Sequence, residues 1–287
     1  MELRTIHTSR GTFLIDPERD KKMTQTLESG AYPNEELLSI ARAFVGGKDT
    51  IVDIGAHIGT FAVPMAKVCK NVIAFEPSRE TFALLLRNAQ ENSAEIRLVN
   101  KALGSVQGSG TLIVRSASNA GANTLMPGGD ITVATLDEEV AHADFIKLDV
   151  EGMELDVLCG GTKLIERARP VIFFEVNLSQ LRAHSTSPHA LERFFTTHGY
   201  RLYLPLEQKK KIILARVQSM TLLTAFIAPR AFLFVSDSAP FDLIAVPRER
   251  ALPLPRAGFA VAILHALKNN VSVKMHRLRA WFGYHSV

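Results

Sequence analysis

Apolar runs typical of buried strands alternate along most of this chain with stretches of helical periodicity. The apolar runs stand at 50–55, 71–77, 96–103, 144–152, 170–177, 200–205 and 241–247. The helical stretches between them cover 59–69, 79–92, 153–167 and 188–198. Because parallel strands need a crossover element between them, this order predicts an α/β fold with helices on both faces of a mostly parallel sheet. Seven strands are expected in that sheet.

Several segments lie outside this alternation. Residues 104–130 are rich in Gly, Ser and Asn and either form a mobile loop or close over a ligand. The apolar stretches "GTLIVRS" and "ITVATLD" in and after that segment form an extra hairpin or extended connections. Residues 209–240 contain "MTLLTAFIAPRAFLFV", in which Pro229 and Arg230 argue against a membrane-spanning helix. We expect an N-terminal cap over 1–48, the sheet domain over 49–249 and a tail over 250–287.

Charge and cysteine content exclude several classes of protein. The formal net charge is +4, but six Lys or Arg and no Asp or Glu follow from Arg250 onward, so the preceding residues carry −2. A basic surface suited to nucleic acid is therefore not indicated. Cys69 and Cys159 show no disulfide or zinc spacing, and both are expected to be buried. The N-terminus has no apolar core of signal-peptide length, so we expect a cytoplasmic protein.

The stretch "VDIGAHIGTF" after the first predicted strand has the form of a nucleotide-binding turn. Gly55 and Gly59 stand four residues apart, so the dinucleotide pattern G-x-G-x-x-G is not met. Glycines let the backbone approach a ligand closely, and Asp53 is a carboxylate inside the strand end. We expect Asp53, the two glycines and the intervening Ala56 and His57 to contact a cofactor.

Polar residues also follow the next two predicted strands. Glu76 and Pro77 end the second strand, and an acid about twenty residues after the glycine turn can accept the hydroxyls of a ribose. Asn100 after the third strand could reach an adenine edge, and the small Ala102 leaves room for the ring. This set suits a nicotinamide dinucleotide too, but the wider glycine turn favours S-adenosylmethionine, which carries an ammonium and no phosphate.

Three ionisable residues mark the end of the fourth predicted strand. In regular strand geometry Lys147, Asp149 and Glu151 share one face, so we expect them at the open end of the sheet, with Asp149 also near the cofactor. A carboxylate at this place can act as a general base that takes the proton of a hydroxyl. Glu151 is our first candidate, followed by Glu175 and Asp149, with His57 fourth.

Each of these residues also has a purely structural interpretation. Glu151 could cap the following helix, Lys147 could pair with Asp149 or Glu175, and His57 could line a wall. The carboxylates could bind a divalent cation, but nothing in their spacing demands it, so no metal is predicted.

At this point the sequence resembles the FkbM family of S-adenosylmethionine-dependent methyltransferases. The matching segments, which run from about residue 11 to residue 247, are "VDIGAHIGTF", "AFEP", "LVNKALG", "TLDEEV", "FIKLDVEGMELDVLCGG", "RPVIFFE" and "FDLIAVP". The resemblance implies a Rossmann-like class I methyltransferase sheet and methyl transfer to a hydroxyl of a sugar, glycan or secondary metabolite. Two other functions stay open: a cofactor-binding scaffold without catalysis, and a nicotinamide-dependent oxidoreductase.

The basic tail is not covered by these motifs. Over 257–283 an apolar stripe with Lys and Arg outside it predicts an amphipathic helix. Such a helix packs on its own domain or on a second copy, or rests on a membrane surface. As partners we expect a small-molecule or glycan acceptor and no nucleic acid.

Overall fold

The computed structural model describes residues 3–114, 123–208, 211–227 and 240–264. Its internal contacts divide the chain into two units, Met1–Phe174 and Glu175–Val287. This division falls inside the fifth predicted strand. The expected boundaries after residues 48 and 249 therefore remain predictions, and most of the expected tail helix, residues 265–287, lies outside the described residues.

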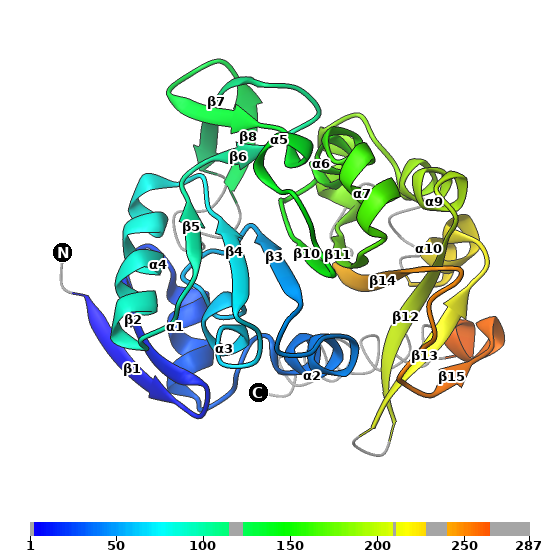
Figure 1. Ribbon diagram of the computed structural model, residues 1–287, viewed down its shortest axis with the longest axis horizontal. Coiled ribbons are helices and arrows are strands. Elements are labelled where there is room, and N and C mark those ends of the chain that lie inside the picture. The colour runs from blue at the N-terminus through cyan, green and yellow to red at the C-terminus, as the bar shows by residue number, and fades with distance from the viewer. Residues whose placement is uncertain (1–2, 115–122, 209–210, 228–239, 265–287) are drawn as a thin grey trace, which may run out of the picture. The chain divides into compact units, whose positions relative to one another are not determined.

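The first unit holds a central parallel sheet, a hairpin, a small second sheet and their helices (Figure 1). Its strands are β1 (Arg4–Thr8), β2 (Gly11–Ile15), β3 (Thr50–Ile54), β4 (Asn71–Phe75), β5 (Arg97–Val99), β6 (Ala102–Leu103), β7 (Gly108–Val114), β8 (Asn123–Pro127), β9 (Ile131–Ala134), β10 (Phe145–Leu148) and the first part of β11 (Val171–Val176). Its helices are α1 (Lys21–Glu28), α2 (Glu35–Phe44), α3 (Ala62–Met65), α4 (Arg79–Glu91), α5 (Leu136–Glu139), α6 (Glu154–Gly160) and α7 (Thr162–Ala168).

The central sheet of this unit has the order β11-β10-β3-β4-β5, and its neighbouring strands are parallel. All four residues of β10 are buried, as expected for a strand covered on both faces. In the pairing of β10 with β3, Lys147 stands opposite Asp53. The expected α/β sheet is confirmed, and the carboxyl ends of β3, β4 and β10 meet at one edge, where open α/β sheets bind ligands.

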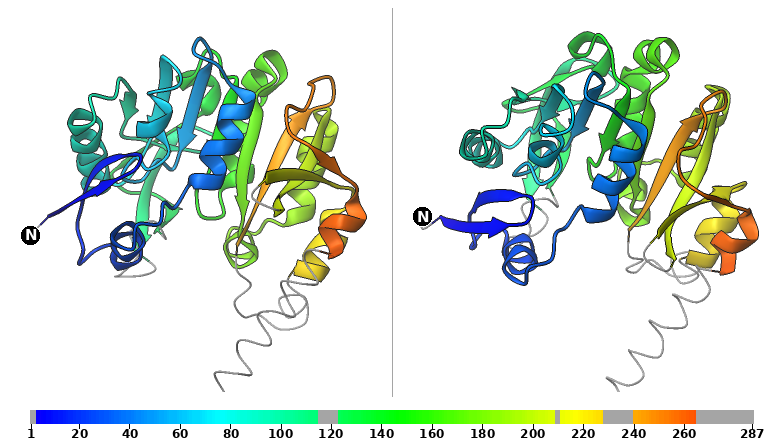
Figure 2. Two further views of the ribbon diagram at one scale, coloured as in Figure 1. Left: turned by 90° about the horizontal axis from the view of Figure 1, so that it is seen from below. Right: turned by 60° about the horizontal axis from the view of Figure 1, so that its bottom comes forward.

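The N-terminal region expected as a cap consists of an antiparallel hairpin and the two helices α1 and α2. β1 pairs with β2, and Figure 2 shows this hairpin beside α1. Phe13 and Ile15 pack with Ile58 of the glycine turn in one buried cluster. Asn88 of α4 accepts a hydrogen bond from the Leu14 amide and donates to the Leu14 and Ile58 carbonyls. These contacts fix the cap against the glycine turn and α4.

The segment expected as a loop over 104–130 forms strands. β6, β9, β7 and β8 make a four-stranded sheet in that order, and β7 pairs antiparallel with both β8 and β9. The open choice between an extra hairpin and extended connections is thus settled in favour of pairing. Residues 115–122, between β7 and β8, lie outside the described residues.

Several predicted elements differ from those observed. The strand expected over 96–103 is divided into β5 and β6, which belong to different sheets. The helix expected over 59–69 is confined to α3, and the strand expected to reach residue 152 ends at Leu148. The helix expected over 153–167 is divided into α6 and α7 at Gly161. A Cβ atom at Gly161 would lie 2.6 Å from the Leu136 side chain, so close packing against α5 accounts for the glycine at this break.

The second unit holds an antiparallel arrangement of strands. Its helices are α8 (Leu178–Ala183), α9 (Pro188–Thr197) and α10 (Met220–Ile227), and its strands are β12 (Tyr200–Gln208), β13 (Lys211–Val217), β14 (Phe241–Pro247) and β15 (Arg256–Ala257). β12 pairs antiparallel with β13 and β14. β13 was not predicted. Within the described part of the chain, no helix has the length and apolarity needed to cross a bilayer.

Candidate active site

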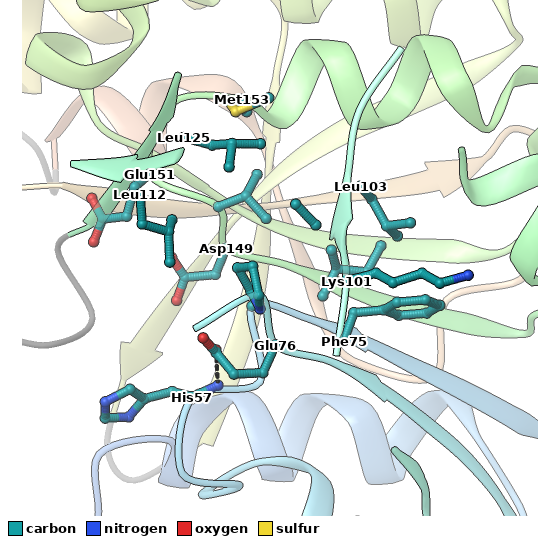
Figure 3. A pocket seen from close by; sticks show the side chains of 15 residues that line it. His57, Phe75, Glu76, Lys101, Leu103, Leu112, Leu125, Asp149, Glu151 and Met153 are labelled. Atoms are coloured by element: carbon teal, nitrogen blue, oxygen red, sulfur yellow. Dashed lines mark hydrogen bonds between the residues drawn. The ribbon is translucent and has the colours of Figure 1, made fainter. Parts of the chain in front are cut away.

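A cavity lies at the carboxyl edge of the central sheet in the first unit (Figure 3). Its enclosed volume is about 80 Å³, and together with the open space at its mouth it measures about 640 Å³. The residues that line it are Ile54, Gly55, His57, Phe75, Glu76, Pro77, Lys101, Ala102, Leu103, Leu112, Leu125, Asp149, Val150, Glu151 and Met153. They come from the ends of β3, β4 and β10 and from the small sheet. The cavity thus forms where the sequence predicts a cofactor, and β7 and β8 of the small sheet supply apolar residues to its wall.

Gly55 brings the glycine turn against the end of β10. Its φ is +78°, and a Cβ atom there would lie 1.9 Å from the Asp149 carbonyl oxygen. Gly59, at φ +93°, does not line the cavity, and a Cβ atom there would lie 2.8 Å from a methyl of Leu85. The positive φ favours glycine at both positions, and at Gly55 the close backbone contact requires it as well; Gly55 also borders the cavity. Ala56 is buried and does not line it.

Glu76 presents a buried carboxylate to the cavity, and its side chain is held by two backbone amides. Oε2 accepts from the His57 amide at 2.9 Å, drawn as a dashed line in Figure 3, and Oε1 accepts from the Ser78 amide at 2.9 Å. Burial raises the pKa of this carboxyl above its usual value. Each carboxylate oxygen can accept more than one hydrogen bond, so a ligand hydroxyl can still donate to this group.

Asp53 and Lys147 form a buried ion pair and do not line the cavity. Lys147 Nζ lies 3.1 Å from Asp53 Oδ1 and donates to the Gly55 carbonyl at 2.6 Å. Burial alone would lower the pKa of Lys147, but the carboxylates of Asp53 and Asp149 reverse this and raise it. The expected pairing with Asp149 is also present, but the distance from Lys147 Nζ to Asp149 Oδ2 is longer, at 3.8 Å. The pair therefore holds the glycine turn in place through the Gly55 carbonyl. Direct contact of Asp53 or Lys147 with cofactor or substrate remains only a prediction.

The residues after β4 and β5 shape one side of the cavity. Pro77 and Ala102 line it, as expected, while Asn100 does not. Asn100 instead donates to the carbonyls of Glu76 and Pro77, at 2.8 and 3.2 Å, and so fixes the turn after β4. Lys101 lines the cavity by position, but its ammonium is paired with Glu139 and points away in Figure 3.

Asp149 and Glu151 both line the cavity, and Figure 3 shows their carboxylates on the same side of it. Their arrangement differs from the expected strand face, because β10 ends at Leu148 and Glu151 adopts a left-handed backbone with φ +55°. Alternation of side chains therefore stops before Asp149. A tight turn, rather than the strand, brings Glu151 to the cavity.

Glu154 is an acidic residue beside the site that the sequence interpretation missed. It is 2% exposed, and its Oε1 accepts from the amides of Val150 and Gly152 at 3.3 and 3.2 Å. Burial, reinforced by the charge of Asp149, raises its pKa to about 7. Glu154 therefore holds the turn that carries Glu151. From the sequence, an acid at this place is indistinguishable from one that interacts with the start of a helix.

The remaining predictions concern the second unit, metals and the cysteines. Glu175 is half-buried in β11 and belongs to the second unit, whereas all residues lining the cavity belong to the first. Within the described residues, no three His, Cys, Asp or Glu side chains gather closely enough to hold a metal ion.

Cys69 is buried as expected, and Cys159 is exposed, contrary to expectation, because it lies on the outer side of α6.

The groups around the cavity suit a nucleoside with a charged chain. The half-buried Leu112 and Leu125 supply apolar surface for a flat base, and Glu76 supplies an acceptor for ribose hydroxyls. The backbone carbonyl oxygens of the Gly55 turn and the carboxylate of Asp149 can accept hydrogen bonds from an ammonium group. These are the features that S-adenosylmethionine requires.

Comparison with known proteins gives one family. The Methyltransferase FkbM domain matches residues 53–202, which is slightly more than half of the chain. The chain is similar to the hexuronic acid methyltransferase AglP of Haloferax volcanii, with 31% identity over 131 residues. That alignment covers 43% of this chain and 54% of the relative, so the match spans about half of the relative's length.

Solved structures show weaker similarity. A methyltransferase FkbM from Methylobacillus flagellatus aligns over 70% of this chain and 44% of its own, with 19% identity and a TM-score of 0.45. The tRNA m1G37 methyltransferase of M. jannaschii aligns over 86% and 55%, with 11% identity and a TM-score of 0.45. The assignment rests on the family match and not on these structures. The chain therefore belongs to the family of FkbM methyltransferase domains, and its cofactor is S-adenosylmethionine.

Proposed function

We propose that this protein transfers a methyl group from S-adenosylmethionine to a hydroxyl of a sugar. The observation that carries the proposal is the buried carboxylate of Glu76, held by two amides at the rim of an otherwise largely apolar cavity. The similarity to a methyltransferase that acts on a hexuronic acid supports a sugar as the acceptor. Because the match covers about half of that relative, the acceptor and its oxygen remain part of the proposal.

Different residues in and around the cavity contact different parts of the cofactor or hold the glycine turn. Glu76 accepts the ribose hydroxyls, and the apolar wall of Leu112 and Leu125 covers the base. The Asp53–Lys147 pair keeps the Gly55 carbonyl, and with it the glycine turn, in place. When bound, S-adenosylmethionine supplies a methyl group on a sulfonium, which needs little further activation. Positioning of the acceptor oxygen is therefore the main task of the protein.

Glu151 is the proposed base. Its carboxylate takes the hydroxyl proton as the oxygen forms its bond to the methyl carbon and the bond from that carbon to sulfur breaks. Its place on a tight turn, held by Glu154 through the Val150 and Gly152 amides, keeps the carboxylate at the cavity. Asp149, on the same side in Figure 3, is the second candidate, followed by His57.

The test is methyl transfer by wild-type protein and by the variant Glu151→Gln. Labelled S-adenosylmethionine is supplied with neutral and acidic sugars, and methylated product is counted. We expect Glu151→Gln to keep the affinity for S-adenosylhomocysteine within a few fold and to lower turnover by about a hundredfold or more. Glu95→Gln, a change at an exposed residue, is the matched control and should leave both unchanged. Unaltered turnover in Glu151→Gln would remove Glu151 from this role, and absence of any methylated sugar would refute the proposed acceptor.

A further inference from the structure

A second cavity lies in the first unit, between the N-terminal cap and α4, with an open volume of about 980 Å³. The residues that line it are Leu3, Ile15, Asp16, Arg19, Asp20, His57, Ile58, Glu80, Thr81, Ala83, Leu84 and Arg87. The two cavities share His57. The enclosed part, about 400 Å³, lies in the range of sites that hold small molecules, which is roughly 300–1,000 Å³.

His57 is fixed from both sides. Its amide donates to Glu76 in the cofactor cavity, and its Nε2 lies 3.0 Å from Asp20 Oδ2 in the second cavity. Asp20 is itself 4% exposed, and its Oδ1 accepts from the Met23 amide at the start of α1. The backbone of His57 is left-handed, at φ +55°, which few residues other than glycine adopt. His57 therefore lies at the point where the two cavities meet, with contacts toward each of them.

Asp16 provides a buried acceptor in the second cavity. It is 4% exposed, and its Oδ1 accepts from the amides of Glu18 and Arg19. Its Oδ2 is buried and accepts no hydrogen bond from the described residues. Because a buried carboxylate oxygen without a donor is costly, this atom suits a ligand that carries hydroxyl groups.

The rest of the lining adds an apolar wall and a cation. The half-buried Leu84 and the exposed Ala83 offer aliphatic surface, against which the C–H face of a sugar ring can pack. Arg19 lies 3.9 Å from Glu80. Arg87 is exposed at the rim, and within the described residues no ion pair involves it. A guanidinium in this position suits a carboxylate, which it can bind with two parallel hydrogen bonds.

We propose that the second cavity is the recognition site for the acceptor, and that the acceptor is a sugar that carries a carboxylate. Asp16 accepts a ring hydroxyl, Arg87 binds the carboxylate, and His57, held by Asp20, positions the reacting hydroxyl toward the cofactor cavity. This inference rests on the proposed function and adds the place of binding and the charge of the sugar. Asp16 and Arg87 thereby act on acceptor affinity and not on the chemical step.

The experiment measures sugar binding directly. Wild-type protein saturated with S-adenosylhomocysteine is titrated with the methyl glycoside of glucuronic acid and with that of glucose, by calorimetry or ligand-observed NMR. We expect the acidic glycoside to bind more tightly. Arg87→Gln should weaken its binding about tenfold and leave the neutral glycoside unchanged, since only the charged contact is lost. Asp16→Asn should weaken both glycosides at least about fivefold, because the amide nitrogen cannot accept from a hydroxyl.

Arg42→Gln, at an exposed arginine of α2 that lines neither cavity, is the control and should change neither affinity. Arg87 is exposed, so its variant tests the inference even if Asp16→Asn unfolds. Equal affinities of wild type and Arg87→Gln for the acidic glycoside, or no saturable binding of either glycoside to wild type, would overturn the inference. Failure of the proposed function would differ, because a glycoside would then bind without any methylated sugar being formed from S-adenosylmethionine.

Discussion

At the scale of single residues, the most informative side chain is Glu154, because its protonation is linked to the turn that carries Glu151. Its pKa rises from 4.5 to about 7 on folding, so the folded protein favours the protonated acid. The associated stability is fully present below pH 4.5 and is lost as the pH rises through 7. The loss amounts to roughly 3 kcal/mol, taken from the size of the shift.

Glu154→Gln removes this titration. We expect the melting temperature of the variant, relative to wild type, to rise between pH 5 and pH 8, because the neutral amide has no charge to bury at the higher pH. Thermal unfolding at the two pH values measures the difference, with Glu91→Gln, at an exposed residue of α4, as the control. A difference between variant and wild type that does not depend on pH would contradict the role of Glu154.

Prediction from the sequence succeeded for some residues and failed for others for definable reasons. Gly55, His57 and Glu76 follow strand ends whose place at the sheet edge is set by the parallel topology, and the structure brings them together at one cavity. Nothing in the sequence indicated that Glu154 lies buried beside the site, because the burial of its side chain depends on how α6 packs. The partner of Lys147 was also missed, because strand order decides that Asp53 lies opposite it.

At the scale of elements, the glycine turn and the end of β10 form one unit. A Cβ atom at Gly55 would lie 1.9 Å from the Asp149 carbonyl, and its φ is +78°. Gly55→Ala should therefore lower the free energy of unfolding by at least about 2 kcal/mol and weaken binding of S-adenosylhomocysteine, because the two loops must separate. Denaturant unfolding and calorimetry measure the two effects.

Gly46→Ala is the matched control for Gly55→Ala, since a Cβ atom at Gly46 meets no atom within 4 Å. It should leave both the free energy of unfolding and the cofactor affinity close to wild type. If Gly55→Ala behaved like this control, the close approach of the two loops would be wrong.

Elements with strong periodicity could be predicted, and elements that depend on pairing could not. β3, β4 and α4 stand close to their predicted places because their apolar patterns are set locally. The small sheet was missed as a sheet because β7 begins with Gly108, Ser109 and Gly110, which are poor strand formers. Their pairing with β9 depends on tertiary context.

At the scale of the whole molecule, the account depends on which cofactor the cavity accepts. The family match, the buried Glu76 and the apolar wall from the small sheet all indicate S-adenosylmethionine. The acidic residue after β4 would also serve a nicotinamide dinucleotide, so the two cofactors must be compared on the same protein.

Calorimetric titration with S-adenosylhomocysteine and with NADH makes that comparison. We predict saturable binding of S-adenosylhomocysteine to wild type, no binding of NADH, and at least about tenfold weaker binding of S-adenosylhomocysteine to Glu76→Ala, which loses the acceptor for the ribose hydroxyls. Binding of NADH together with no binding of S-adenosylhomocysteine would contradict the account.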